Sequence, residues 1–282
     1  MMIQILNGLV YGGLLYILSL GLVLLFGLRR VVNFAHGALF MVGAYVGYTA
    51  ASITNYWIAL VGAMIILAVL GALLDVFVLR PLQKEDPLVT VLVTFGLLIL
   101  LEHAALIIWG KDFRSLPVPA ILDGTVRLQG EEFPLYRLFV IGVAAAVALG
   151  MSLWLKLSRV GLYVRASSVD PLTTGILGVK TDRISIGVVA LGTSLAGLAG
   201  MVAAPLLAIS PSMGSYILIE SFIVVVIGGL GSFTGAFFAA LLVGQIYNFG
   251  AVYMPWAASI IPFLIMVVIL IWKPTGMAGK HV

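Results

Sequence analysis

Apolar stretches long enough to cross a membrane follow one another along the chain, separated by short polar or glycine-rich segments. A helix rises about 1.5 Å per residue, so about 20 apolar residues cross a hydrocarbon core about 30 Å thick. The pattern predicts spans at 5–28, 38–54, 56–79, 88–109, 135–156, 184–209, 216–229, 234–250 and 256–272. Because 38–54 and 216–229 are short enough for half-helices or re-entrant segments, we predict eight or nine spans. The chain is then an all-α polytopic membrane protein with one transmembrane domain over residues 1–282.

Two longer hydrophilic segments interrupt this pattern. The first, residues 110–134, predicts an ordered loop on the outer side of the membrane, with a short hairpin around Asp123-Gly124. The second, residues 157–183, carries glycines and a proline at intervals that interrupt a continuous helix. We therefore expect short helical pieces in this segment, which is the longest loop on the inner side.

Composition indicates a chain that faces lipid. Hydrophobic residues make up 62% of the chain and charged residues 9%, whereas a soluble domain has about 45–50% apolar and about 25% charged residues. The 32 glycines allow helices to approach closely, which matters where lipid removes the hydrophobic drive for association. The chain has no cysteine, and this excludes disulfides and thiolate metal ligands.

The distribution of Lys and Arg predicts the orientation, because inner loops are enriched in these residues. The loops assigned to the inner side hold Arg29, Arg30, Arg80, Lys84, Lys156, Arg159, Arg165, Lys180, Arg183, Lys273 and Lys280. The loops assigned to the outer side hold Lys111, Arg114, Arg127 and Arg137. We therefore predict the N-terminus outside and the C-terminus inside. Since the basic residues belong to these short loops, the net charge of +4 does not indicate a nucleic-acid partner.

The sequence lacks motifs for nucleotide or metal chemistry. A phosphate-binding loop needs G-x-x-x-x-G-K-[ST], but Gly-Lys occurs only at 110–111 and 279–280, followed by Asp and His. The pair Glu102-His103 is not a zinc motif, because adjacent residues face different sides of a helix. We expect no metal, no cofactor and no catalytic residue in this chain, and we predict that it is not an enzyme.

Several ionisable residues lie inside predicted spans, where such residues are functional candidates by default. Asp75 lies five residues before Arg80, which favours a paired carboxylate near the inner end of its span. Glu102 and His103 lie deeper, and both a structural hydrogen-bonded pair and a pathway role stay open for them. Glu220 starts a short predicted span and could cap it, because carboxylates favour helix N-termini.

Two breaks between apolar stretches are further candidates. In residues 29–48, Asn33 is a good N-cap and Gly37 permits close backbone approach. This stretch is either a tightly packed helix start or a broken helix beside a solute path. In residues 224–245, a cluster of glycines cannot sustain an ordinary helix, so a sharp turn is predicted at Gly228, Gly229, Gly231 and Gly235.

Three stretches of the sequence resemble one transporter family. They are VVNFAHGALFMVGAY (31–45), GLYVRASSVDPLTTGILGV (161–179) and VIGGLGSFTGAFFAALLVG (226–244). In this order, and over about residues 3–276, they are similar to the permeases of branched-chain amino acid ABC importers, the Liv-type family. No long charged extension precedes the first predicted span, which is similar to the shorter, H-type member of the usual pair of unlike permeases.

The resemblance implies a type II-like ABC importer permease fold in a bacterial inner membrane, surrounded by membrane lipid. A second homologous permease would complete the path as a heterodimer. Two cytoplasmic ATPase subunits would bind ATP and Mg, and a periplasmic solute-binding protein would deliver the solute. The loop at about 158–182 would contact the ATPases through the residues that match the family motif, which are Gly161, Arg165, Ala166, Asp170 and Gly178. Pro171 and Thr174 depart from that motif and leave the boundaries of the coupling helix open.

The resemblance also implies that both breaks shape the translocation path. The matching residues are Asn33, Phe34, His36, Gly37, Gly228, Gly229 and Gly231, and for His36 we expect a fixed hydrogen bond. Our hypothesis is an ATP-driven importer subunit for branched-chain or other neutral amino acids. The alternatives are a secondary transporter or channel for a small polar solute, such as urea, an amide or an amino acid, working without ATPases, and a membrane-embedded enzyme that uses His36 or Glu102.

Overall fold

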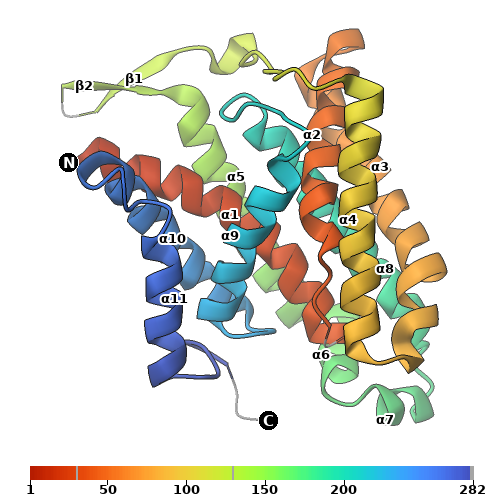
Figure 1. Ribbon diagram of the computed structural model, residues 1–282. Helices are drawn as coiled ribbons and strands as arrows, with labels where there is room; N and C mark the ends of the chain where they lie inside the picture. Colours follow the sequence, from red (N-terminus) through yellow and green to blue (C-terminus); the bar gives the residue numbers. More distant parts are fainter. Residues whose placement is uncertain (30, 129, 280–282) are drawn as a thin grey trace.

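The computed structural model describes residues 1–29, 31–128 and 130–279, and helices account for most of them (Figure 1). The α-helices are α1 Met2–Arg29, α2 Ala35–Ile53, α3 Tyr56–Leu74, α4 Pro87–Trp109, α5 Leu135–Leu157, α6 Arg159–Val169, α7 Pro171–Ile176, α8 Thr181–Ala203, α9 Met213–Gly228, α10 Phe233–Tyr253 and α11 Ile261–Trp272. The π-helical turn η1 Asp75–Leu79 and the 3-10 helix η2 Pro81–Lys84 extend α3. Between α4 and α5 lie the 3-10 turn η3 Ala120–Leu122 and the strands β1 Thr125–Leu128 and β2 Glu131–Pro134.

A helix lies at each predicted span, but the predicted count of eight or nine membrane spans is not confirmed, and the helix of the predicted span 256–272 begins only at Ile261. In the part of the chain that the structure describes, six helices are long and apolar enough to cross a membrane, namely α1, α3 with its extensions, α4, α5, α8 and α10. Helices α9 and α11 are apolar but shorter. The predicted span 184–209 is too long, because α8 ends at Ala203 and the chain then turns. Conversely, α9 begins at Met213, before the predicted start at 216.

The long helices differ sharply in their surroundings. In their most apolar windows, α1 is 83% buried and α8 is 72% buried, whereas α4 is 17% buried. Helix α1 crosses the molecule obliquely and packs against α8, α9 and α10, while α2 and α3 pack on α8 (Figure 1). We call α1, α2, α8 and α9 the central helices. Helices α3, α4, α5 and α11 form the rim.

Glycines allow the central helices to cross at short distances. A side chain at Gly43 of α2 would meet the Cα of Gly197 on α8 at 2.6 Å. On α1, a side chain at Gly21 would meet the carbonyl oxygen of Gly192 on α8, also at 2.6 Å. Such small-residue contacts are the usual means of helix association in lipid, and they explain why a glycine-rich chain forms stable helices here.

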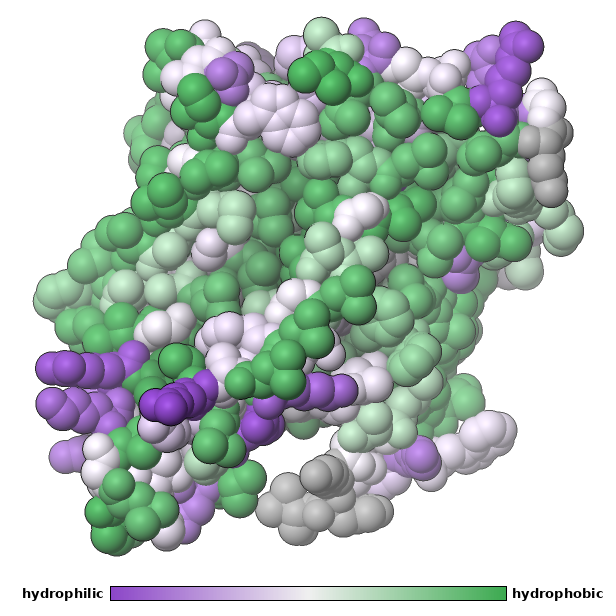
Figure 2. Space-filling view, turned by 180° about the vertical axis from the view of Figure 1, so that it is seen from behind, coloured by the Kyte–Doolittle hydropathy of each residue, from purple (hydrophilic) through white to green (hydrophobic). Residues whose placement is uncertain are grey.

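The surface of the molecule follows the pattern of a membrane protein. Figure 2 shows a broad hydrophobic band across the middle, with hydrophilic residues gathered towards the two ends. We call these the α6–α7 end and the hairpin end, after the elements found there (Figure 1). Arg80, Lys84 and most other basic side chains belong to elements at the α6–α7 end, whereas Lys111, Arg114 and Arg127 lie in the segment between α4 and α5.

The hairpin predicted in residues 110–134 is present, but its turn is not at Asp123-Gly124. Strand β1 begins directly after Gly124 and pairs antiparallel with β2, with Thr125 opposite Pro134 and Leu128 opposite Glu131. Gly130, with a φ of 87°, lies in the connection. Asp-Gly is a common turn dipeptide, but here the residue with a left-handed backbone is the later Gly130.

Candidate functional site

A cavity of about 770 Å³ opens at the α6–α7 end. Five parts of the chain meet around it: the end of α1 with residues 31–33, the turns after α3, the first turn of α4, the junction of α6 and α7, and the start of α8. Asn33 and Asp170, which the sequence analysis placed in separate sites, both line this cavity. The structure therefore brings the first break and the 158–182 segment together.

The first break lies inside the apolar layer. Residues 31–34 are not helical, and the backbone N–H of Phe34 donates to Thr94 Oγ1 at 3.2 Å. Thr94 lies seven residues into α4, about 10 Å along its axis, and is fully buried. Non-helical backbone at such depth is tolerated where protein groups satisfy it, and Thr94 supplies that hydrogen bond.

Asn33 acts just outside the helix that it was predicted to cap. Helix α2 begins at Ala35 after Phe34, and Asn33 Oδ1 accepts a hydrogen bond of 3.0 Å from the Ala35 N–H. The Phe34 ring lies between α4 and α9, with its centroid 6.3 Å from that of Phe95 and 6.4 Å from that of Phe222. The non-helical segment is thus held by a hydrogen bond to the start of α2 and by ring contacts with α4 and α9.

His36 and Gly37 join α2 to two central helices. His36 is fully buried and its Nε2 lies 3.0 Å from the carbonyl oxygen of Leu18 on α1. Since a carbonyl can only accept, Nε2 carries the proton in this contact. A side chain at Gly37 would collide with the backbone of Gly214 and with Leu218 on α9. Both residues therefore have a packing role at the break.

Short helices form the 158–182 segment, as the sequence predicts. Ser158 Oγ accepts from the Gly161 N–H at 2.8 Å and starts α6. A side chain at Gly161 would meet the carbonyl oxygens of Trp154 and Leu155 within 2.6 Å, so this glycine lets α6 fold back against the end of α5. At the far end, Gly178 has a φ of 87°, which favours glycine.

Asp170 has a local structural role that the resemblance did not imply. It is the N-cap of α7, and its Oδ1 accepts from the backbone N–H groups of Leu172 and Thr173 at 3.0 Å each. The Thr173 hydroxyl donates to Oδ2 at 2.5 Å, and together these contacts hold the pKa of the Asp170 carboxyl below its usual range. Pro171 occupies the first position of α7, where proline is favoured. Arg165 is exposed and Ala166 half-buried on α6.

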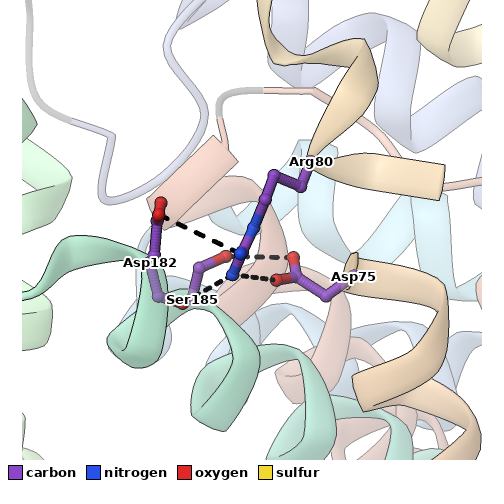
Figure 3. Close-up of polar contacts among 4 residues, drawn as sticks. All are labelled: Asp75, Arg80, Asp182 and Ser185. Carbon is purple, nitrogen blue, oxygen red and sulfur yellow. Dashed lines mark hydrogen bonds and ion pairs between the residues drawn. The ribbon is translucent and has the colours of Figure 1, made fainter. Parts of the chain in front are cut away.

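An ion-pair network joins α3 to the first turn of α8, beside the cavity (Figure 3). Asp75 is fully buried, and its Oδ2 lies 3.8 Å from Arg80 Nη2. Ser185 Oγ donates to Asp75 Oδ1 at 3.0 Å. Arg80 also lies 4.0 Å from the Asp182 carboxylate and donates to the Asp182 carbonyl oxygen at 3.3 Å. Asp75 is therefore a paired carboxylate, as its spacing from Arg80 predicts.

The other intramembrane acids differ from the predictions. Glu102 does not pair with His103: its Oε1 accepts from the Ser215 N–H at 3.0 Å and from the Ser215 hydroxyl at 2.7 Å. His103 is exposed, and its Nδ1 contacts the Ile99 carbonyl oxygen of its own helix. Glu220 caps nothing, because α9 begins seven residues earlier. It instead accepts a hydrogen bond from the Tyr11 hydroxyl on α1.

The second break is the predicted sharp turn between α9 and α10. Gly229 and Gly231 have φ values of 97° and 84°, and Ser232 starts α10 by accepting from the Gly235 N–H at 3.1 Å. Residues 273–279 fold against the turn, with the Ala278 N–H 3.1 Å from the Gly228 carbonyl oxygen. A cavity of about 540 Å³ borders this turn and the Ser168 side of α6. Whether either break contacts solute stays a prediction.

Sequence reasoning missed two features of this end. The first is the pairing of Arg80 with Asp182 and of Asp75 with Ser185, which needs the three-dimensional approach of α3 and α8. The second is a group of exposed apolar side chains on α6 and α7, which we call the apolar surface of α6–α7: Leu162, Val169, Leu172, Ile176 and Leu177. Apolar residues within a polar loop are the signal that could have found it.

Among the residues that the structure describes, no group of three or more His, Cys, Asp or Glu side chains could hold a metal ion.

The chain matches a family model described as "Branched-chain amino acid transport system / permease component" over residues 4–270. The chain belongs to this family. It is therefore similar throughout its length to permease components of transport systems, and its apolar helices are those of a multi-pass membrane protein.

Individual relatives agree with the family match. The chain is 26% identical to the high-affinity branched-chain amino acid transport system permease protein BraD of Pseudomonas aeruginosa, over 98% of this chain and 95% of that protein. It is 25% identical to the corresponding permease protein LivH of Escherichia coli K12, with the same coverage. A shorter match, 34% identical over 47% of this chain and 40% of the relative, is to the fructose import permease protein FrcC of Rhizobium meliloti. No solved structure matches the chain.

Proposed function

We propose that this chain is a non-catalytic permease subunit of an ATP-driven ABC importer for branched-chain or other neutral amino acids. It works with a second homologous permease, two ATPase subunits that bind ATP and Mg, and an external solute-binding protein. The full-length family match supports the transport role. The apolar surface of α6–α7 is the observation that carries the coupling role.

That surface is unusual for a loop region. Leu172, Ile176 and Leu177 are 73%, 76% and 78% exposed, although they lie outside the long apolar helices. Exposed apolar patches mark sites of protein contact. A cytoplasmic ATPase that covers this patch would bury it. Because Ser158 caps α6 and Asp170 caps α7, the two short helices would transmit a movement of the ATPase without unfolding.

Movement of α6–α7 would reach the transmembrane helices through α8. The first turn of α8 follows α7 after four residues, and it holds Asp182 and Ser185, which contact the Arg80–Asp75 pair. A push on α7 would therefore act on α3 and α8 together. The cavity lined by Asn33 and Asp170 lies between these parts and would change shape with them.

This proposal places the α6–α7 end in the cytoplasm and the hairpin end outside. The excess of Lys and Arg at the α6–α7 end supports that orientation, and it puts α6–α7 on the side where ATP is available. The substrate assignment rests on the branched-chain amino acid permeases, which match over 98% of the chain. The fructose import permease matches only 47% of the chain and therefore carries less weight.

The experiment is reconstitution of the chain with its partner permease, ATPases and binding protein in proteoliposomes, followed by leucine uptake with and without ATP. Ile176→Glu should prevent ATPase subunits from co-purifying and should abolish uptake. Ile121→Glu is the matched control, because Ile121 is equally exposed, at 76%, in the segment before β1. Gradient-driven uptake by the chain without ATPases would instead support a secondary transporter or channel.

A further inference from the structure

Ionisable groups inside the apolar layer gather around one short helix, α9. Glu102 contacts Ser215 of α9 from α4, and Glu220 lies at the middle of α9 itself. Asp75 and His36 are fully buried elsewhere, in contacts with their own chain. Ionisable residues in membrane spans face a bundle interior or a water-filled cavity and mark solute pathways.

Helix periodicity shows how these carboxylates lie around α9. With about 100° per residue, Ser215, which Glu102 contacts, and Glu220 are about 140° apart around the helix axis. Tyr216 and Ile219 project between them, at about 100° and about 40° from Ser215. These two side chains are 70% and 46% exposed. The exposed strip of α9, defined by Tyr216 and Ile219, therefore has a carboxylate on each flank.

Side chains from two neighbouring helices hold the Glu220 carboxylate in place. The Tyr11 hydroxyl on α1 donates to its Oε2, and the Tyr11 ring stacks on Tyr247 of α10 with a centroid distance of 4.8 Å. Three helices thus position one carboxylate that is only half-buried. Helix α9 has 16 residues, about 24 Å, and is shorter than the hydrocarbon core of about 30 Å.

We propose that the exposed strip of α9 forms one wall of the solute passage, and that Glu220, held by Tyr11, contacts the ammonium group of the passing amino acid. This inference rests on the proposed function, which supplies a zwitterionic solute. Lipid cannot solvate the carboxylate of Glu220 beside this strip, whereas water in a passage can. A solute ammonium group would then find a hydrogen-bond acceptor of opposite charge at mid-depth.

Thiol labelling tests the wall. Because the chain has no cysteine, Ile219→Cys introduces its single thiol, and Ile65→Cys on the rim helix α3 is a matched control at 59% exposure. The complete transporter is treated with a membrane-impermeant, cationic methanethiosulfonate, and the labelled peptide of this chain is quantified. We expect Ile219→Cys to react at least about tenfold faster than Ile65→Cys, since methanethiosulfonates react with the thiolate that water, not lipid, stabilises. Equal rates, or no labelling of either variant, would place the strip against lipid or protein and overturn the proposal.

Glu220→Gln tests the contact with the solute. Glutamine keeps the size and an oxygen for Tyr11, so assembly of the complex with its ATPases should be unchanged. Leucine uptake should fall about tenfold or more, which corresponds to about 1.4 kcal/mol, because the solute loses its hydrogen bond to a charged group. Glu220→Asp should recover part of the uptake. Glu131→Gln on the exposed strand β2 is the control. Normal uptake by Glu220→Gln would refute this inference and leave the proposed function standing, whereas absence of ATP-dependent uptake by the unmodified complex would refute the proposed function.

Discussion

Helices α1 and α4 are nearly equal in hydropathy but occupy opposite environments. Their mean hydropathies are 2.3 and 2.4, yet α1 is 83% buried and α4 is 17% buried. The difference lies in the glycines. A side chain at Gly12 or Gly21 of α1 would meet the backbone of a neighbouring helix, whereas a side chain at Gly96 of α4 would meet nothing within 4 Å. Hydropathy identifies both helices as spans, whereas the glycine contacts distinguish the central helix α1 from the rim helix α4.

The largest expected effect separates a central glycine from a rim glycine. Gly43→Leu places a side chain against the Gly197 backbone on α8, only 2.6 Å from its Cβ. Since α8 cannot move without displacing α1 and α3, we expect a loss of stability above about 3 kcal/mol, at the upper end of overpacking costs. Thermal unfolding in detergent and the yield of monodisperse protein measure it. Gly96→Leu is the control and should change neither, and comparable melting of both variants would refute the distinction.

The second prediction concerns the buried Asp75–Arg80 pair at the end of the rim helix α3, which contacts Ser185 and Asp182 of the central helix α8. Asp75→Asn keeps an acceptor for Ser185 but removes the charge beside Arg80. Breaking a fully buried pair costs about 3–5 kcal/mol, and because Arg80 is about one-third exposed we expect about 2 kcal/mol.

Asp182→Asn provides the comparison, because its side chain is 69% exposed and exposed ion pairs contribute about 0–1 kcal/mol. Thermal melts of both variants at one ionic strength give the ranking. If Asp182→Asn lowered the melting temperature more than Asp75→Asn, the buried Asp75 would not be the main contributor to the contact between α3 and α8.

The third prediction concerns the attachment of the rim helix α5. The Tyr136 hydroxyl donates to the Val202 carbonyl oxygen of α8 at 2.9 Å and lies 2.8 Å from the Tyr56 hydroxyl of α3. Tyr136→Phe leaves both partners without this hydrogen bond in a buried site, and we expect a loss of about 1–2 kcal/mol. Tyr253→Phe, at a side chain that is 64% exposed, should have no measurable effect on the melting temperature. Equal melting of the two variants would mean that packing alone holds α5.

Sequence reasoning found the helices because a span needs about 20 apolar residues wherever it lies. It also found the pairing of Asp75 with Arg80, since the two are close in sequence. It failed for Glu102 and Glu220, because their partners Ser215 and Tyr11 lie more than 100 residues away. Local spacing carries no information about such contacts. The same limit hid the cavity that Asn33 shares with the α6–α7 junction.

The smallest expected effect lies in α7, which belongs to neither the centre nor the rim. Asp170→Ala removes the acceptor for the Leu172 and Thr173 N–H groups, so these amides should exchange with solvent faster while the melting temperature stays unchanged. Asp170→Asn keeps an acceptor oxygen and should retain most of the protection. The hydrogen bonds from Thr173 lower the pKa of Asp170, so the cap is fully formed above the usual range of an aspartate. The cap is lost only when the Asp170 carboxylate becomes protonated, as the pH falls through its lowered pKa. Protection that declined between pH 8 and pH 6 would therefore contradict the assignment of Asp170 as the cap.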